Sequence, residues 1–279
     1  MKKNNRKIDI PIEWLPSLGQ CHVRFMLMQK HNIPHQNSYD EKLFRAAKAL
    51  LLWMQLGQLD ESRLASIWSM IAGEDWDVRD VSFTKQATEH RKYVVRYYRR
   101  FLWFYNFLHE HQEQTKFRFE HIHRPFNAVL GNVNLIGSID AITREQAKIP
   151  HTIWVLDNPY YAFKSWHLFR NPYIHACGYG GMHLLGKKGI RIQYVDLRNK
   201  KVHRILPKQE HIDHLAYLTR TVYEIMDQGL YYPIYNAQCK SCPVIIECER
   251  GDWIEDRIYR QAKWESAANR GRRNGDSSV

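Results

Sequence analysis

The sequence contains no run of eighteen apolar residues, and its first stretch, MKKNNRKIDIPIEW, lacks the apolar segment of a signal peptide. It contains no G-x-x-x-x-G-K-[ST] motif, so ATP hydrolysis at a phosphate loop is not indicated. It also lacks the H-E-x-x-H motif of a histidine-based zinc hydrolase, and it has no internal repeat. We therefore expect a soluble, cytoplasmic protein that does not contact a membrane.

Cysteine is scarce: the chain has five, and without an export signal a disulfide framework explains this odd number poorly. Three cysteines form a C-x2-C-x5-C segment, in which thiolates of one short loop can converge on a metal. Cys21 is favoured over Cys177 as the fourth ligand, because a metal that joins both ends of the chain would stabilise the fold directly. The predicted ligands are Cys21, Cys239, Cys242 and Cys248.

Two alternatives remain open for these cysteines. Zinc competes with an iron-sulfur cluster, because spacing alone does not separate the two kinds of four-thiolate site. Buried thiols without a metal are the other alternative, although the tight triplet of cysteines argues against it.

Apolar and basic residues are abundant. The chain has 279 residues, of which 44% are hydrophobic and 13% aromatic, enough for a sizeable buried core. Its formal net charge is +12, and its sequence pI is about 9.4. Such a protein attracts polyanions, of which nucleic acid is the most common, while acidic protein surfaces are the alternative partner.

Hydrophobic periodicity predicts a helical first third, followed by strands that alternate with helices. The predicted helices span residues 11–31, 41–56, 61–72, 85–111, 165–185 and 209–229. The predicted strands span 116–124, 133–143 and 151–157, which suggest a meander, and then 190–197 and 201–206 with a turn between them. This order favours an α/β or α+β fold with a helical insertion.

One predicted helix, 85–111, carries a basic side. Lys92, Arg96, Arg99 and Arg100 share one side of such a helix, where they can follow phosphate groups. The alternative is an ordinary solvated face over an apolar stripe that packs in the core. Exposed aromatic side chains would stack on unpaired bases, which points to DNA with single-stranded character as the partner.

The chain resembles the iron-sulfur branch of the RecB-like PD-(D/E)XK nucleases in three features. These are a cysteine that precedes a helical lobe, a meander of strands, and a C-terminal C-x2-C-x5-C segment. That branch includes CRISPR-associated adaptation nucleases and AddB-type recombination proteins, and the resemblance covers about residues 11–250. It implies a nuclease-like core of a mixed sheet flanked by helices, with an N-terminal helical lobe. It also implies a [4Fe-4S] cluster, rather than zinc, that staples the N- and C-terminal parts together.

The resemblance divides the chain into four parts. We expect an N-terminal segment with a helical lobe, the nuclease-like core, a cysteine segment and a flexible basic tail. Their expected ranges are 1–114, 115–235, 236–264 and 265–279.

The resemblance also implies a nuclease centre. In LIGSIDAI, Gly137 and Asp140 match the family's G-x-x-D strand, and the next strand, HTIWVLDNP, places Asp157 at the acidic position of the D/E-x-K motif. Asp140 and Asp157 would hold Mg²⁺ or Mn²⁺, which activates water and polarises the phosphodiester. Pro159 stands where the family has its lysine and can neither donate a proton nor stabilise charge. Lys164 is the candidate that would take the lysine's place as the third catalytic residue, and the alternative is that it is an ordinary surface lysine.

Further departures from the family pattern affect the predicted function. Tyr179 fits the tyrosine of the family's Q-x-x-x-Y helix and is grouped here with the nucleic-acid-binding residues, but His175 stands in place of the glutamine. The G-x-x-x-H motif has no match between residues 39 and 72. We therefore expect a protein that acts on DNA in replication, recombination or repair, with impaired or lost cleavage and a DNA-binding or assembly role, as part of a larger complex. The alternatives are an active Mg²⁺- or Mn²⁺-dependent exonuclease or endonuclease, and a structural adaptor that uses the fold only for docking.

Overall fold

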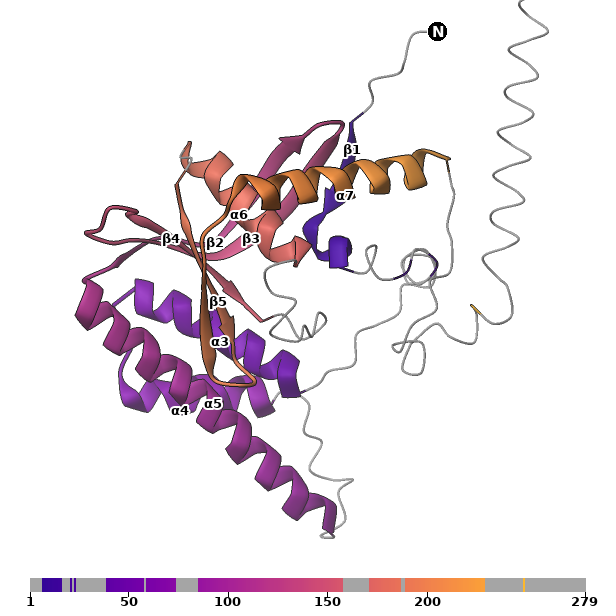
Figure 1. The fold of residues 1–279 in the computed structure, drawn as a ribbon. Coiled ribbons are helices and arrows are strands. Elements are labelled where there is room, and N and C mark those ends of the chain that lie inside the picture. The colour runs from indigo at the N-terminus through magenta and orange to yellow at the C-terminus, as the bar shows by residue number, and fades with distance from the viewer. Residues whose placement is uncertain are drawn as a thin grey trace, which may run out of the picture. The chain divides into compact units, whose positions relative to one another are not determined.

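Figure 1 shows the computed structural model of the protein, a mixed α/β fold. The structure describes residues 7–16, 21, 23, 39–57, 59–73, 85–157, 171–186, 189–228 and 248. The chain divides into two compact units. Unit 1 comprises Met1–Pro34, Val129–Asn134 and His214–Val279, and unit 2 comprises His35–Ala128 and Leu135–Asp213.

Unit 2 contains the elements that carry the predicted nuclease centre. Its helices are α3 (Tyr39–Gln55), α4 (Glu61–Gly73), α5 (Lys85–Thr115) and α6 (Pro172–Leu185). Its strands are β2 (Arg118–Leu130), β3 (Val133–Arg144), β4 (His151–Leu156), β5 (Arg191–Asp196) and β6 (Lys201–Ile205), of which the β2–β3 turn falls in unit 1. These ranges confirm the predicted helices 41–56, 61–72 and 85–111 and all five predicted strands.

Two element boundaries differ from the predictions. Strand β2 runs to Leu130 instead of stopping near 124, because the segment RPFNAV continues to alternate between exposed and buried side chains. The described helix α6 begins at Pro172, where the side chain of Asn171 accepts a hydrogen bond from the backbone N–H of Tyr173 at 2.9 Å. A capping residue followed by proline at the first helical position is a typical start of a helix.

The sheet is mixed. Its strand order is β1-β3-β4-β5-β6, where β1 is Ile8–Pro11, and β2 pairs with β3. Strand β4 is antiparallel to β3 and parallel to β5, and β6 returns antiparallel to β5 through a turn. The predicted meander β2–β3–β4 is therefore confirmed, and the parallel pair β4–β5 is joined by a connection that contains α6.

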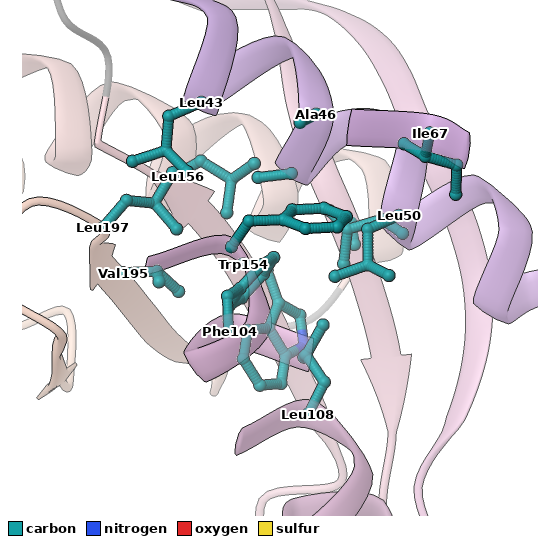
Figure 2. Close-up of a cluster of buried hydrophobic side chains, with 14 of the residues drawn as sticks. Leu43, Ala46, Leu50, Ile67, Phe104, Leu108, Trp154, Leu156, Val195 and Leu197 are labelled. Carbon is teal, nitrogen blue, oxygen red and sulfur yellow. The ribbon is translucent and has the colours of Figure 1, made fainter. Parts of the chain in front are cut away.

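The main core of unit 2 lies between the sheet and helices α3, α4 and α5. Figure 2 shows Trp154 and Leu156 of β4 facing Leu50 of α3 and Phe104 of α5. Trp154 is fully buried, and its Nε1 donates a hydrogen bond of 2.9 Å to the hydroxyl of Thr143 on β3. Aromatic residues of α3, α4 and α5, among them Phe44, Trp68 and Phe104, therefore cover this face of the sheet.

Helix α6 covers the opposite face of the sheet in unit 2. It packs on Ile153, the neighbour of Trp154 in β4, and successive residues of a strand point to opposite sides. Its GYGG segment brings the backbone against the strands: a Cβ at Gly178 would lie 2.7 Å from Ile192, and one at Gly181 would overlap Ile153. Glycine is needed at these positions for close approach to the sheet.

Replacing Gly181 with alanine should lower the free energy of unfolding by about 1–3 kcal/mol, because the added methyl group overpacks against Ile153. Chemical denaturation measures the change. Gly189→Ala is the matched control, since in the described part of the chain no atom lies within 4 Å of a Cβ at that position. Equal stabilities of the two variants would contradict the close packing of α6 on the sheet.

A buried histidine sits at the end of α5. The ring of His111 stacks on Phe107 at 5.7 Å between centroids and meets Trp154 edge-on. Its Nε2 lies 3.1 Å from the amide nitrogen of Gln193 and 3.9 Å from Glu145. Burial lowers the pKa of His111, and the nearby Glu145 carboxylate opposes that shift.

Acid should therefore destabilise the fold through His111. Because its folded pKa lies below the ordinary value of 6.5, the unfolded chain takes up the proton first, and the free energy of unfolding falls as the pH drops below that value. Urea unfolding on both sides of this pH measures the slope. His111→Phe should flatten the slope, whereas His121→Phe, at an exposed position of β2, should leave it unchanged. An unaltered slope in His111→Phe would refute this account.

Unit 1 contains β1 (Ile8–Pro11), the 3-10 helix η1 (Ile12–Trp14) and most of α7 (Gln209–Gln228). The backbone N–H of Ile8 bonds to the carbonyl of Asn132 at 3.2 Å, and Asn134 donates a side-chain hydrogen bond to Asp9 at 2.8 Å. The prediction of a helix over 11–31 is wrong at its start, because Pro11 ends a strand that the periodicity did not reveal and Ile12–Trp14 form a 3-10 helix. Most of 17–31 lies outside the described residues. The predicted helix 209–229 is confirmed.

Among the residues that the structure describes, no helix is long and apolar enough to cross a membrane. The predicted tail 265–279 and most of the predicted cysteine segment 236–264 lie outside the described residues. The four domain ranges remain predictions.

Candidate nuclease centre and basic hollow

Asp140 lies in β3 and is almost completely buried, with 3% exposed. Its Oδ1 lies 3.2 Å from Nζ of Lys48, which α3 supplies. Its Oδ2 accepts a hydrogen bond of 2.8 Å from the backbone N–H of Leu156 in β4. The negative charge of Asp140 is therefore balanced by a lysine of the chain itself, and its second oxygen is tied to the neighbouring strand.

A histidine lies close to this ion pair. Burial, and then the positive charge of Lys48, lower the pKa of His123, while the Asp140 carboxylate acts in the opposite direction. His123 belongs to β2 and has a positive φ of 49°, which is uncommon for a residue other than glycine. Because the pKa of His123 is lowered from 6.5, its ring is neutral at neutral pH. The positive charge that pairs with Asp140 is therefore that of Lys48.

Asp157 follows β4 directly and is also buried. Its Oδ1 accepts a hydrogen bond of 2.6 Å from the hydroxyl of Tyr194 in β5, and its Oδ2 accepts one of 2.9 Å from Nε of Arg198 in the turn after β5. Burial raises the pKa of Asp157, and these two donors oppose the rise by stabilising the carboxylate. Burial and the adjacent Asp157 charge likewise raise the pKa of Tyr194, so its hydroxyl remains a donor.

The two carboxylates come from neighbouring strands, as the sequence predicts. The regular pairing of β3 with β4 runs from Arg144 and His151 to Ala141 and Trp154. Beyond it, Asp140 bonds through its side chain to the residue that precedes Asp157. The structure therefore brings Asp140 to the end of β4 from which Asp157 projects.

This arrangement does not fit a resident divalent metal ion. Mg²⁺ and Mn²⁺ prefer a shell of oxygen ligands, and Mg²⁺ needs nearly octahedral geometry. Here an ammonium group occupies one side of Asp140, and Asp157 accepts from a phenol and a guanidinium. Within the described ranges, no group of three or more His, Cys, Asp or Glu side chains is placed to hold a metal. The site therefore contains two buried carboxylates, Asp140 and Asp157, each of which is paired with a cation of the chain.

A hollow of about 820 Å³ lies beside this site, between α5 and the turn that joins β5 to β6. We call it the basic hollow, and among the residues that the structure describes it is lined by Lys92, Val95, Arg96, Arg99, Arg100, Arg198, Asn199 and Lys200. Of these described side chains six are cationic and none is acidic. The four basic residues predicted to share one side of α5 therefore do so, and Arg198 and Lys200 join them from elsewhere in the chain.

Aromatic rings and an acidic residue support the arginines of the hollow. The guanidinium of Arg96 lies 5.5 Å from the ring centre of Tyr93, and that of Arg100 lies 4.6 Å from the ring centre of Tyr97. Burial raises the pKa of Tyr97, as does its hydrogen bond to the carboxylate of Asp40. The apolar stripe predicted on α5 packs in the main core through Phe101 and other residues of the helix.

The remaining predicted site residues are placed as follows. Pro159, Lys164, Cys239 and Cys242 lie outside the described residues. Cys21 and Cys248 are half-buried residues of unit 1, and Cys177 is buried in α6. Tyr179 is half-buried in α6 and does not belong to the residues that line the basic hollow.

Sequence reasoning missed Lys48, Tyr194 and Arg198, which set the charge balance of the site. One signal for Lys48 existed, because it interrupts an otherwise apolar run, AAKALLL, in an amphipathic helix. Arg198 stands in a segment that the sequence marks only as a turn. Tyr194 reads as an ordinary strand residue, and only the parallel pairing of β4 with β5 brings it to Asp157.

Comparison with known proteins gives one informative match. The profile of the PD-(D/E)XK nuclease superfamily matches residues 15–249, most of the chain. No curated protein matches it. A solved structure described as "Crystal structure of SSO0001" is similar at 11% sequence identity with a TM-score of 0.36, covering 88% of this chain and 86% of that chain. A TM-score this low supports no inference about function.

Proposed function

The chain belongs to the PD-(D/E)XK nuclease superfamily, and from that premise we propose that it binds DNA with single-stranded character while its own cleavage activity is impaired or lost. The observation that carries this proposal is the pairing of both acidic positions with cations of the chain: Asp140 with Lys48 and Asp157 with Arg198. A carboxylate that is buried and already neutralised is a poor ligand for a catalytic metal, because metal binding would first have to displace its partner.

The sequence supports the loss of cleavage independently. Pro159 occupies the position of the D/E-x-K lysine, and a proline side chain carries no charge for the transition state. Removing one preorganised charge from an active site typically lowers the rate by about a hundredfold or more. The altered motif and the two ion pairs therefore point to the same functional outcome.

A second candidate function, metal-dependent cleavage, is favoured by one observation. Lys48 places an ammonium group 3.2 Å from Asp140, so a lysine from α3 stands near the acidic residues although the motif lysine is missing. If DNA binding displaced Lys48 toward the scissile phosphate, it would supply the missing positive charge. In this arrangement its ammonium group would supply a charge and would not act as a base.

Two parallel assays test the proposed function. Fluorescence anisotropy with labelled single-stranded and duplex DNA, over a range of salt concentrations, measures binding. Incubation of the same DNA with Mg²⁺ or Mn²⁺ measures cleavage. We expect binding that weakens steeply with salt and no cleavage above that of Asp140→Ala. Metal-dependent cleavage that Asp140→Ala removes would establish the second candidate, and the absence of any DNA binding would leave the adaptor alternative.

A cofactor proposal accompanies the function. Cys21, Cys239, Cys242 and Cys248 are proposed to hold a [4Fe-4S] cluster, with zinc as the alternative. The spacing of the cysteines supports a four-thiolate site, and the resemblance to the iron-sulfur branch of the RecB-like nucleases favours iron over zinc. A cluster would supply a covalent staple between distant parts of the chain. Anaerobic purification with iron, sulfide and zinc analysis tests it: Cys239→Ser should remove the metal, whereas Cys177→Ala, in α6, should retain it.

A further inference from the structure

One side chain belongs to both the candidate nuclease centre and the basic hollow. Arg198 donates from Nε to Oδ2 of Asp157 at 2.9 Å, and it also lines the hollow with 26% of its side chain exposed. A guanidinium group has five N–H donors in a rigid plane, so one edge can hold a carboxylate while other donors remain directed elsewhere. Arg198 is therefore placed where a bound anion and Asp157 would both attract it.

A polar chain continues from Arg198 to the other wall of the hollow. Nη1 of Arg198 lies 3.9 Å from Oδ2 of Asp40 in α3, and the Asp40 carboxylate accepts a hydrogen bond from Tyr97. Tyr97 in turn is hydrogen-bonded to Arg100, which lines the hollow. The order Asp157, Arg198, Asp40, Tyr97, Arg100 thus links the buried carboxylate to arginines on both walls.

Asp157 and Asp40 are not among the residues that line the hollow, whereas six of its described lining residues are cationic. Lys92, Arg96 and Arg99 project from successive turns of α5, and Arg198 and Lys200 face them from the turn. A row of cations along a helix suits a ligand with several phosphates in sequence better than a single small anion. Without an anion in the hollow, Asp157 and Asp40 are the negative groups that offset the charge of Arg198.

We propose that the phosphates of a nucleic-acid strand bound in the basic hollow compete with Asp157 for Arg198, so that strand binding and the Asp157–Arg198 ion pair oppose each other. This inference rests on the proposed function, because it assumes that nucleic acid is the ligand. The hollow is then the binding site for the nucleic-acid strand, and Arg198 couples the occupancy of the hollow to the state of Asp157. Binding in the hollow would weaken the hold of Arg198 on Asp157, and any change that releases Arg198 from Asp157 would strengthen binding.

The test is a set of affinity measurements with a fluorescein-labelled oligodeoxythymidylate, with EDTA present so that no metal ion contributes. Asp157→Asn keeps the shape of the side chain but releases Arg198, so we expect the dissociation constant to fall about 3- to 10-fold, near the lower end of typical coupling strengths. Arg198→Gln should weaken binding by more than about tenfold. In the Arg198→Gln background, Asp157→Asn should no longer tighten binding, because the side chain that it releases is gone.

Glu145→Gln is the matched control. Glu145 is buried to the same degree as Asp157, at 6% exposed, and it is paired with an arginine in the same way, through Nη1 of Arg191 at 2.8 Å. Arg191 does not line the hollow, so Glu145→Gln removes an equal charge and should change the dissociation constant less than about twofold. Equal tightening by Asp157→Asn and Glu145→Gln would show a general charge effect and would overturn the proposal.

Two further arms keep the test decisive. If Asp157→Asn fails to fold, Asp40→Asn replaces it, and a smaller tightening is expected because Asp40 lies 3.9 Å from Arg198. Inorganic tripolyphosphate serves as competitor: if it binds as tightly as the oligonucleotide, the hollow holds small polyphosphates and the assignment to a strand is wrong. Should the wild-type protein bind DNA while Arg198→Gln and Asp157→Asn leave the affinity unchanged, the inference fails and the proposed function stands.

Discussion

Replacing Lys48 with methionine is expected to lower the free energy of unfolding by about 2–3 kcal/mol, because the buried carboxylate of Asp140 then loses its only cation among the described residues. Breaking a fully buried ion pair typically costs about 3–5 kcal/mol. The expected loss is smaller here because 31% of the Lys48 side chain is exposed and because Asp140 keeps its hydrogen bond to Leu156. Urea denaturation of the wild type and the variant measures the difference.

A double substitution separates charge from packing. In Lys48→Met/Asp140→Asn both charges are gone, so stability should recover by about 1–2 kcal/mol relative to Lys48→Met alone. Lys208→Met is the control, since its ion pair with Glu210 joins two exposed side chains and should contribute almost nothing. If the single and double variants of the buried pair are equally unstable, Lys48 acts through packing and the neutralisation of Asp140 is not what stabilises this site.

Reversing two charges in the basic hollow is expected to have the largest effect on binding. In Arg96→Glu/Arg99→Glu, two lining cations become anions on the same side of α5. The affinity for single-stranded DNA should fall by about a hundredfold or more at low salt, and the slope of log affinity against log salt should decrease in magnitude by about 1.4, which corresponds to two lost phosphate contacts. Anisotropy titrations at several salt concentrations measure both quantities.

Lys208→Glu/Arg220→Glu provides the matched control for net charge. Both residues are exposed and lie outside the lining of the hollow, so this variant changes the total charge by the same amount. Its affinity should fall only slightly, because neither side chain lines the hollow in which the strand is proposed to bind. Comparable losses in the two double variants would mean that DNA is attracted by net charge and has no site in the hollow.

The sequence predicts the elements of unit 2 well because their signals are local. Helices α3, α4 and α5 carry apolar stripes at helical spacing, and β3 and β4 consist of short apolar runs between turn residues. Asp140 and Asp157 could be identified because they fall at fixed positions of these strands. Strand β1 was missed because IDIP is only four residues long and ends at Pro11, where the helical periodicity of the predicted helix 11–31 begins.

The charge balance of the site could not be predicted because it depends on tertiary contacts. Lys48 and Asp140 are separated by ninety-two positions in the chain, and Asp157 and Arg198 by forty-one. No periodicity or spacing rule connects such residues. The basic side of α5 was predictable from helical geometry, but the second wall of the hollow comes from the β5–β6 turn, whose place opposite α5 is set by the packing of the helices on the sheet.

We propose that Asp140 and Asp157 are held by cations of the chain and are not kept ready for a metal. Calorimetric titration of Mn²⁺ into the DNA-free protein tests it most directly, with Asp140→Asn/Asp157→Asn as the reference. We predict that the two proteins give the same weak, non-saturating signal. Saturable binding to the wild type that the double substitution removes would contradict the claim and would show that Mn²⁺ displaces Lys48 or Arg198 from these carboxylates.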